Sequence, residues 1–424
     1  MKNKKQWISI LVVAMSLATA WAIRGQFGHE QGAAWAGAIG GLAVVLVSNR
    51  KDWYNKMILV ALASAVGWGA GGMISYGRVV GFGRADNFVN AFYGLGMLFV
   101  IGALFGLLGG GLVGLTLDST KGNRVKWGSL IAQMTAGGII SYFFLIAQIG
   151  IKMTPPRSEA WAVCLGAGLA MLWYMAREKR NSAIRVAIFA ALGGGFGFAF
   201  GNFLQIFGNV LEINFNMWNV MEYSIGFFGG TGMAYGVFSS KWVQEETVPK
   251  KWENSIALFL VVVFIPLIIF RETLAFEHLF RNFKDLQNPE NIAKFSAAFS
   301  AILMLAMAVI LCWKLNKSIF KKSDVMLFFP ILLSVYIVLS YTLKGLFAGV
   351  THFNHHLYLL NLLVIFVLSR KERPAIFESL TDKVDSGKWI IYLIAIIFVI
   401  AVLTFVSINI HGELGGAHNR FSIN

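Results

Sequence analysis

The stretch AWAIRGQFGHEQGAAWAGAIGG, residues 20–41, decides the fold because it ends one apolar run and begins another. Arg24, His29 and Glu30 lie between the two runs, together with glycines that let the chain turn tightly. The apolar runs cover roughly residues 6–23 and 31–48, and each is long enough to cross a bilayer as a helix. The stretch therefore predicts two membrane helices joined by a short polar turn.

The rest of the chain repeats this pattern. Hydrophobic residues make up 57% of the 424 residues, charged residues make up 13%, and the mean hydropathy is +0.66. The apolar residues form blocks of about 17 to 25, which is typical of membrane helices. Because a helix satisfies its own backbone hydrogen bonds in lipid, we expect an all-α, polytopic integral membrane protein. No polar segment is longer than roughly 26 residues, which is too short for a soluble domain with its own core.

About thirteen blocks qualify as transmembrane helices. They cover roughly residues 6–23, 31–48, 57–75, 89–117, 128–151, 159–176, 183–200, 221–239, 255–270, 296–313, 325–343, 356–369 and 388–409. The first block has an alternative interpretation as a cleaved signal peptide, because lysines precede it and Ala20 and Ala22 form an A-x-A site. Cleavage would leave about twelve spans. An uncleaved helix is favoured because the next span begins after only a few residues.

The distribution of basic residues predicts the orientation. The connections on the side of the N-terminus hold 25 of the 36 lysines and arginines, and the other side holds the remaining 11. The positive-inside rule then places the N-terminus in the cytoplasm and the C-terminus outside. We expect a multi-pass protein of a cell membrane, in particular the bacterial inner membrane. The basic pI of about 9.8 indicates contact with membrane lipids and is no argument for a nucleic-acid partner.

Glycine content divides the chain into two predicted regions. Residues 1–240 form a glycine-rich transmembrane bundle, and residues 255–424 form a C-terminal transmembrane bundle with few glycines. Residues 64–83 resemble residues 190–209 in their alternating glycines, and residues 92–110 resemble 222–238. These matches predict parallel hairpin repeats in the first region. Glycines at three- and four-residue spacing also allow close helix packing, which would produce the same pattern without a repeat.

Polar side chains gather on the predicted outer side, where all seven histidines fall. We expect the half-hydrophobic segment 201–221 to lie at this face without crossing the membrane, with Glu212 turned toward Arg24. A local ion pair between Arg24 and Glu30 is the alternative for the opening stretch. The candidate substrate-binding residues are Arg24, His29, Glu30, Arg78, Arg84, Asp86, Asn202, Gln205, Glu212, Glu222, His352, His355 and His356.

Two classes of function fit these residues. The first is a transporter or permease with an outward-facing polar site for a small solute, anionic if the arginines face it. The alternative is an extracytoplasmic-facing membrane transferase that acts on a lipid-linked or surface glycan substrate, with His29 or Glu30 as general base. A structural partner without chemistry is a third class. The sequence identifies no catalytic residue and no cofactor, and it leaves the choice between transport and catalysis open.

Metal binding is a weaker hypothesis for the same side. His352 and His356 lie four residues apart and would need a further ligand such as His411, Glu413 or His29. Because no strict ligand spacing is present, we predict no metal site. The two cysteines, Cys164 and Cys312, fall in separate predicted spans and indicate no disulfide framework.

Overall fold

The computed structural model describes residues 2–155, 157–350, 352–370, 375–378, 380–412 and 414–422, and these residues are mostly helical. The long helices are α1 (Lys2–Arg24), α2 (His29–Ser48), α4 (Met57–Gly72), α6 (Phe88–Asp118), α7 (Trp127–Tyr142), α8 (Ala160–Arg177), α9 (Asn181–Val210), α10 (Met217–Ser239), α14 (Pro289–Leu315), α15 (Lys322–Leu343), α16 (Phe353–Arg370) and α17 (Ser386–Ile410). The short ones are α3 (Lys51–Tyr54), α5 (Gly77–Gly83), α11 (Lys251–Phe259), α12 (Ile265–Ile269) and α13 (Phe276–Phe283). Helix α7 continues as a π-helix to Gln148, and π-helical turns join α11 to α12 and extend α12 to Leu274.

Ten helical stretches among the described residues are long and apolar enough to cross a membrane. The number is eleven if α4 and α5, which are bent by 64° at their junction, count as one span. These helices fit a multi-pass membrane protein and confirm the all-α fold class. Helices α10 and α16 also occupy predicted spans, but they are less apolar than the ten. Glycines and Glu222 in α10 and polar residues such as His355 in α16 lower their hydropathy. The count of about thirteen therefore stays a prediction.

The glycine-rich helices pack backbone against backbone. Where α6 crosses α9, a Cβ atom on Gly102 would overlap the carbonyl oxygen of Gly194, and one on Gly106 would overlap that of Ala190. Helix α9 also packs along α10, and α10 packs along α1. Lipid offers no hydrophobic force between helices, so close van der Waals contact is the main source of such packing.

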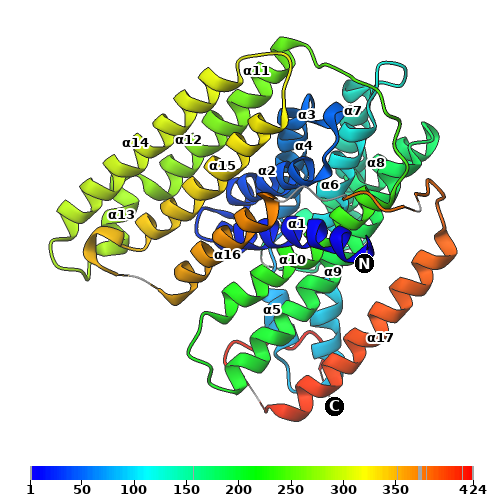
Figure 1. Cartoon of the computed structure of the whole chain (residues 1–424). Coiled ribbons are helices and arrows are strands. Elements are labelled where there is room, and N and C mark those ends of the chain that lie inside the picture. Colours follow the sequence, from blue (N-terminus) through cyan, green and yellow to red (C-terminus); the bar gives the residue numbers. More distant parts are fainter. Residues whose placement is uncertain are drawn as a thin grey trace.

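The helices after residue 250 lie in three places. Figure 1 shows α12, α14 and α15 running side by side, with α13 at one end of α14. Helix α16 packs against α1 and α15. Helix α17, drawn in red, lies on another side of the molecule and packs against α6 and α9 of the glycine-rich region (Figure 1).

The segment 201–221 is more regular than the sequence suggests. Helix α9 continues through it to Val210, and α10 begins at Met217, so only a short loop separates them. Phe200, Phe203 and Phe207 stack at helical spacing along this extension. Glu212 lies exposed in the loop, with a positive φ of 50°.

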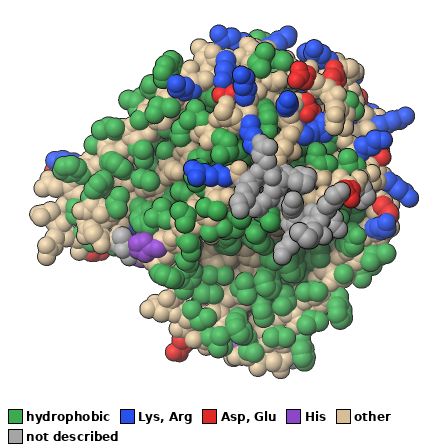
Figure 2. Space-filling model, in the orientation of Figure 1, with side chains coloured by type: hydrophobic (Ala, Val, Ile, Leu, Met, Phe, Trp, Pro, Cys, Tyr) green, Lys and Arg blue, Asp and Glu red, His purple; other side chains and the backbone are tan. Residues whose placement is uncertain are grey.

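Charged and apolar surfaces are segregated. Figure 2 shows lysine and arginine side chains gathered along the upper and right margins of the molecule, with hydrophobic side chains over much of the area between and below. The basic connections contribute exposed lysines such as Lys121, Lys126 and Lys250. We call the side formed by these connections the basic face.

The close approach of α6 and α9 predicts a position-specific effect of a single methyl group. Gly106→Ala should lower the free energy of unfolding by about 1–3 kcal/mol, because the added Cβ must push the two backbones apart. Gly96→Ala is the matched control, since no atom lies within 4 Å of a Cβ placed on this glycine of the same helix. Thermal unfolding of the purified protein in detergent measures both. Equal melting temperatures for the two variants would contradict tight packing at Gly106.

Candidate functional site

A polar cavity of about 1330 Å³ opens at the helix ends opposite the basic connections. The connections that line it are those between α1 and α2, α4 and α5, α9 and α10, and α15 and α16, together with residues 157–158 and His418. Because the positive-inside rule predicts that these helix ends face outward, we call it the outer cavity. Its polar lining residues are Gln26, His29, Glu30, Ser75, Tyr76, Arg78, Arg157, Ser158, Asn214, Asn216, Asn219, Glu222, Lys344, His352, Asn354, His355 and His418.

A buried ion pair forms the base of the outer cavity. Arg24, the last residue of α1, has a side chain with 0% exposed surface, and its guanidinium contacts the Glu222 carboxylate of α10. Nη2 donates to Oε2 at 3.0 Å and to Oε1 at 3.2 Å, and Nε donates to Oε2 at 3.2 Å. Burial of two charges is costly. The contacts between them offset that cost only when further hydrogen bonds satisfy the remaining donors and acceptors of both side chains.

Tyr76 and His29 provide these further hydrogen bonds. The Tyr76 hydroxyl donates to Oε1 of Glu222 at 2.5 Å and accepts from Nη2 of Arg24 at 2.9 Å. Nη1 of Arg24 lies 3.1 Å from Nδ1 of His29. Because a guanidinium can only donate, Nδ1 must be the acceptor, and the neutral imidazole then carries its proton on Nε2. His29 therefore offers the outer cavity an N–H donor.

Aromatic side chains close the space toward the middle of the helices. The Arg24 guanidinium lies 4.8 Å from the Trp21 ring centroid, one turn earlier in α1. Trp21 packs against Trp68 at 5.0 Å and against Phe105 at 5.5 Å. Since these aromatic side chains are fully buried, the outer cavity ends at the Arg24–Glu222 pair, near the end of α1 and the start of α10.

The second wall comes from α16. Asn354 donates to the Tyr358 hydroxyl at 3.1 Å, this hydroxyl donates to Oδ1 of Asn219 at 2.7 Å, and Asn219 donates to the carbonyl oxygen of Ala22 at 2.9 Å. This chain of hydrogen bonds links α16 to α10 and α1. His355 lies beside it with 1% of its surface exposed, and neither ring nitrogen has a hydrogen-bond partner in the described part of the chain.

The side chains that line the outer cavity carry a positive excess. Arg78, Arg157 and Lys344 contribute cations, whereas the carboxylates are Glu30 and Glu222, and Glu222 already pairs with Arg24. Arg78 also approaches His418, with Nη1 3.4 Å from Nε2. Desolvation, and then the charge of Arg78, lowers the pKa of His418 below its ordinary value. Both effects leave the imidazole neutral near pH 7, so it adds no charge.

The predicted site residues fall into two groups. His29, Glu30, Arg78, Glu222, His352 and His355 line the outer cavity, and Arg24 lies directly behind Glu222. The local Arg24–Glu30 pair is replaced by a contact between residues 198 positions apart.

The remaining predicted residues lie elsewhere. Arg84 donates to the carbonyl oxygen of Gly415 at 3.2 Å, and Asp86 accepts a hydrogen bond from Asn87. Asn202 and Gln205 are buried within the bundle and bond to each other at 3.1 Å. Glu212 is exposed and does not line the cavity, although Asn214 and Asn216 of the same loop do. His356 approaches the Tyr341 hydroxyl at 3.1 Å.

Sequence reasoning missed several residues of the wall, among them Tyr76, Arg157, Asn219 and Lys344. Arg157 and Lys344 are among only 11 basic residues on the predicted outer side. Because basic residues are scarce on that side, each of them is a candidate for the site. Tyr76 carried no such signal, whereas Asn219 belongs to the polar segment 201–221, which the sequence predicts at this face. Among the described residues no group of three or more His, Cys, Asp or Glu could hold a metal ion, and Glu413 lies outside those residues.

The buried pair makes a prediction about stability. Glu222→Gln should destabilise the protein by about 3–5 kcal/mol, because it leaves the Arg24 charge buried without a counter-ion. The double variant Arg24→Gln/Glu222→Gln should be less destabilised than Glu222→Gln alone, since neither charge remains. Lys294→Gln, which breaks an exposed pair with Glu290, is the control and should melt like the wild type. Melting temperatures in detergent test this prediction. A wild-type melting temperature for Glu222→Gln would contradict a buried ion pair between Arg24 and Glu222.

Comparisons with known proteins provide no relative for this chain. It matches no known protein-family model, no curated protein and no solved structure. Its function must therefore be argued from the cavity and its residues.

Proposed function

We propose that the chain is a multi-pass transporter or permease whose outer cavity is the outward-facing binding site for a small anionic solute. The observation that carries this proposal is the cationic excess of the cavity wall above a base in which Arg24 and Glu222 are already paired. The proposal includes about thirteen spans, a cytoplasmic N-terminus, an outer C-terminus and a place in a cell membrane, in particular the bacterial inner membrane.

The position of the cavity between two sets of helices supports transport. Residues of α1, α2, α5 and α10, together with the α4–α5 connection, form one side, and Lys344, His352 and His355 contribute the other from the α15–α16 region. Transporters commonly bind their substrate where two helix bundles meet, so that rocking of one bundle opens the site to the other side. The aromatic layer around Trp21 and Trp68 is then the barrier that must part during transport.

The chemistry of the wall supports an anion as solute. Arg78 and Arg157 offer planar guanidinium groups, which bind carboxylate or phosphate in a bidentate manner. His29 adds a neutral N–H donor through Nε2. An anion that reached Arg24 would compete with Glu222 for the same guanidinium, which links solute binding to the contact between α1 and α10.

One observation favours the transferase alternative. The buried His355 has two unpartnered ring nitrogens and lines the outer cavity, as expected of a general base for the hydroxyl group of a lipid-linked or surface glycan. His29 fits this role less well, because Arg24 occupies Nδ1 and leaves Nε2 as a donor. The end of the cavity near the outer helix ends also suits an enzyme that works from one side.

Ligand binding to paired variants tests the proposal. Small carboxylates, phosphate, sugar phosphates and neutral sugars would be screened by thermal shift on the purified protein. An anion at about 100 times its Kd should stabilise the wild type by about 2.7 kcal/mol. The shift should persist in Arg177→Gln, an exposed arginine outside the cavity, and disappear in Arg78→Gln/Arg157→Gln.

The same anion should enter proteoliposomes that contain the wild type and should not enter those that contain the double variant. Binding without uptake would favour the transferase. Stabilisation by neutral sugars alone, or an unchanged anion shift in the double variant, would refute an anion site.

Orientation is tested separately by cysteine labelling. In a background with Cys164 and Cys312 replaced by serine, Asn214→Cys in the outer cavity should react with a membrane-impermeant maleimide in intact cells. Lys121→Cys on the basic face should react only after the cells are permeabilised, because the positive-inside rule places it in the cytoplasm. The reverse pattern would invert the proposed topology.

A further inference from the structure

A second cavity lies on the opposite side of the molecule from the outer cavity. It has a volume of about 620 Å³ and lies between α4, the end of α6, α7 and the start of α11. We call it the inner groove. Most of its length is lined by apolar side chains, which are Leu59, Leu62, Ala63, Val66, Leu112, Leu130, Ile131 and Met134. Val66 and Ile131 are exposed, so the inner groove opens sideways toward the lipid that surrounds the helices.

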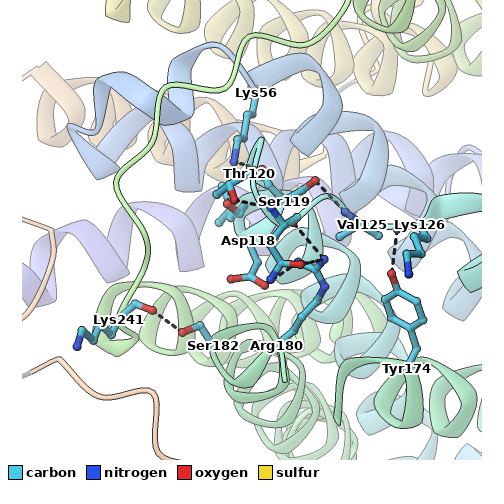
Figure 3. A network of polar contacts seen from close by, with 12 residues as sticks. Lys56, Asp118, Ser119, Thr120, Val125, Lys126, Tyr174, Arg180, Ser182 and Lys241 are labelled. Carbon is cyan, nitrogen blue, oxygen red and sulfur yellow. Dashed lines mark hydrogen bonds and ion pairs between the residues drawn. The ribbon is translucent and has the colours of Figure 1, made fainter. Parts of the chain in front are cut away.

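One end of the inner groove is polar, and Lys56 is its central group. Its Nζ donates to the carbonyl oxygens of Leu117 at 2.9 Å and Ser119 at 2.6 Å. An ammonium group has three donors, so one remains for a further acceptor. Asp118 next to these carbonyls pairs with Arg180 at 3.0 Å (Figure 3). Burial lowers the pKa of Lys56 to about 8, as expected of a cation held mainly by neutral carbonyl groups.

Two further side chains complete the polar end. The Thr247 hydroxyl is buried, with 9% of the residue exposed, and has no hydrogen-bond partner in the described part of the chain. Arg124 is exposed at the same end and adds a second cation. Glu253 is the carboxylate of this lining, and its Oε2 already accepts a hydrogen bond from the backbone of Lys250 at 2.8 Å. The polar end therefore presents positive charge and an unused hydroxyl.

We propose that the inner groove binds one phospholipid with an anionic headgroup, taken from the leaflet at the basic face. An acyl chain lies along the side chains of α4 and α7, and the phosphate lies between Lys56, Arg124 and Thr247. The phosphate accepts the third hydrogen bond of Lys56 and the hydrogen bond that Thr247 can donate. This site is separate from the outer cavity and does not depend on the function proposed for it.

Position and shape favour a lipid as the occupant. The volume lies within the range of about 300–1,000 Å³ that is usual for small-molecule sites. Trp127 and Trp252 line the mouth of the groove, and tryptophan is enriched at the level of lipid headgroups. Anionic lipids concentrate on the cytoplasmic side, where the positive-inside rule places the basic connections. A cationic headgroup would face two like charges, so we expect discrimination against it.

The test compares lipids with the same acyl chains and different headgroups. Native mass spectrometry of the purified full chain would be titrated with phosphatidylglycerol, with phosphatidylcholine and with glycerol phosphate, which has no acyl chain. The wild type should bind one phosphatidylglycerol about tenfold more tightly than phosphatidylcholine. It should show no binding of glycerol phosphate at the same concentrations.

Two variants address the two ends of the site. Ala63→Phe fills the inner groove and should abolish the preferential phosphatidylglycerol binding, whereas Ala395→Phe on the exposed face of α17 should leave it unchanged. Thr247→Val removes only the hydroxyl, and it should weaken the binding of phosphatidylglycerol about threefold to tenfold without loss of folding, because the lipid phosphate loses one hydrogen bond.

Equal affinity for both lipids, or wild-type binding by Ala63→Phe, would overturn the proposal. Binding of glycerol phosphate as tight as that of the lipid would also overturn it, because the site would then be one for free phosphate.

Discussion

The contact between Arg24 and Glu222 is the constraint on which the rest of the structure depends. It joins the last residue of α1 to α10 from a distance of 198 positions in the sequence, and the Arg24 side chain has no exposed surface while that of Glu222 is 8% exposed. Such a pair is tolerable only with further hydrogen bonds, and these come from Tyr76 at the α4–α5 bend and His29 at the start of α2. Four segments are thereby fixed around one point, and the outer cavity is the space that they leave above it.

Glycine makes this arrangement sterically feasible. Helices α1, α6, α9 and α10 must approach closely for residues on separate helices to meet at the cavity base, and side chains at Gly102, Gly106 or Gly194 would hold the helices apart. Helices that are held by such contacts have little freedom to move relative to one another within the glycine-rich region. Motion, if the protein transports a solute, is then concentrated at the boundary with α15 and α16, where larger side chains such as Tyr358 and His355 meet the cavity.

The sequence predicts the helices well because lipid leaves the backbone few alternatives. Every predicted span is helical, and the polar turn between α1 and α2 is where the pattern placed it. Site residues are harder to predict from the sequence, because contacts between helices decide which of them lie together. Arg78 and Arg84 look equivalent in sequence, yet Arg78 lies in the first turn of α5 and Arg84 follows its last residue, and of the two only Arg78 reaches the outer cavity. Asn202 and Gln205 resemble cavity residues by type but face each other within the bundle. Glu222 was on the predicted list, but nothing in the sequence identified it as the partner of Arg24.

The tail after α17 has a consequence for biogenesis. His418 donates its backbone N–H to the carbonyl oxygen of Gly81 at 2.9 Å, and the backbone N–H groups of Arg420 and Phe421 donate to Oδ1 of Asn90. These residues follow the last long helix, whereas α1, α2 and α5 are made first. During synthesis the early hairpins are made before these contacts can form, and His418 adds its part of the cavity wall only after α17 has been made. A chain that stops before α17 therefore lacks this part of the wall, although the segments around Arg24 and Glu222 are already present.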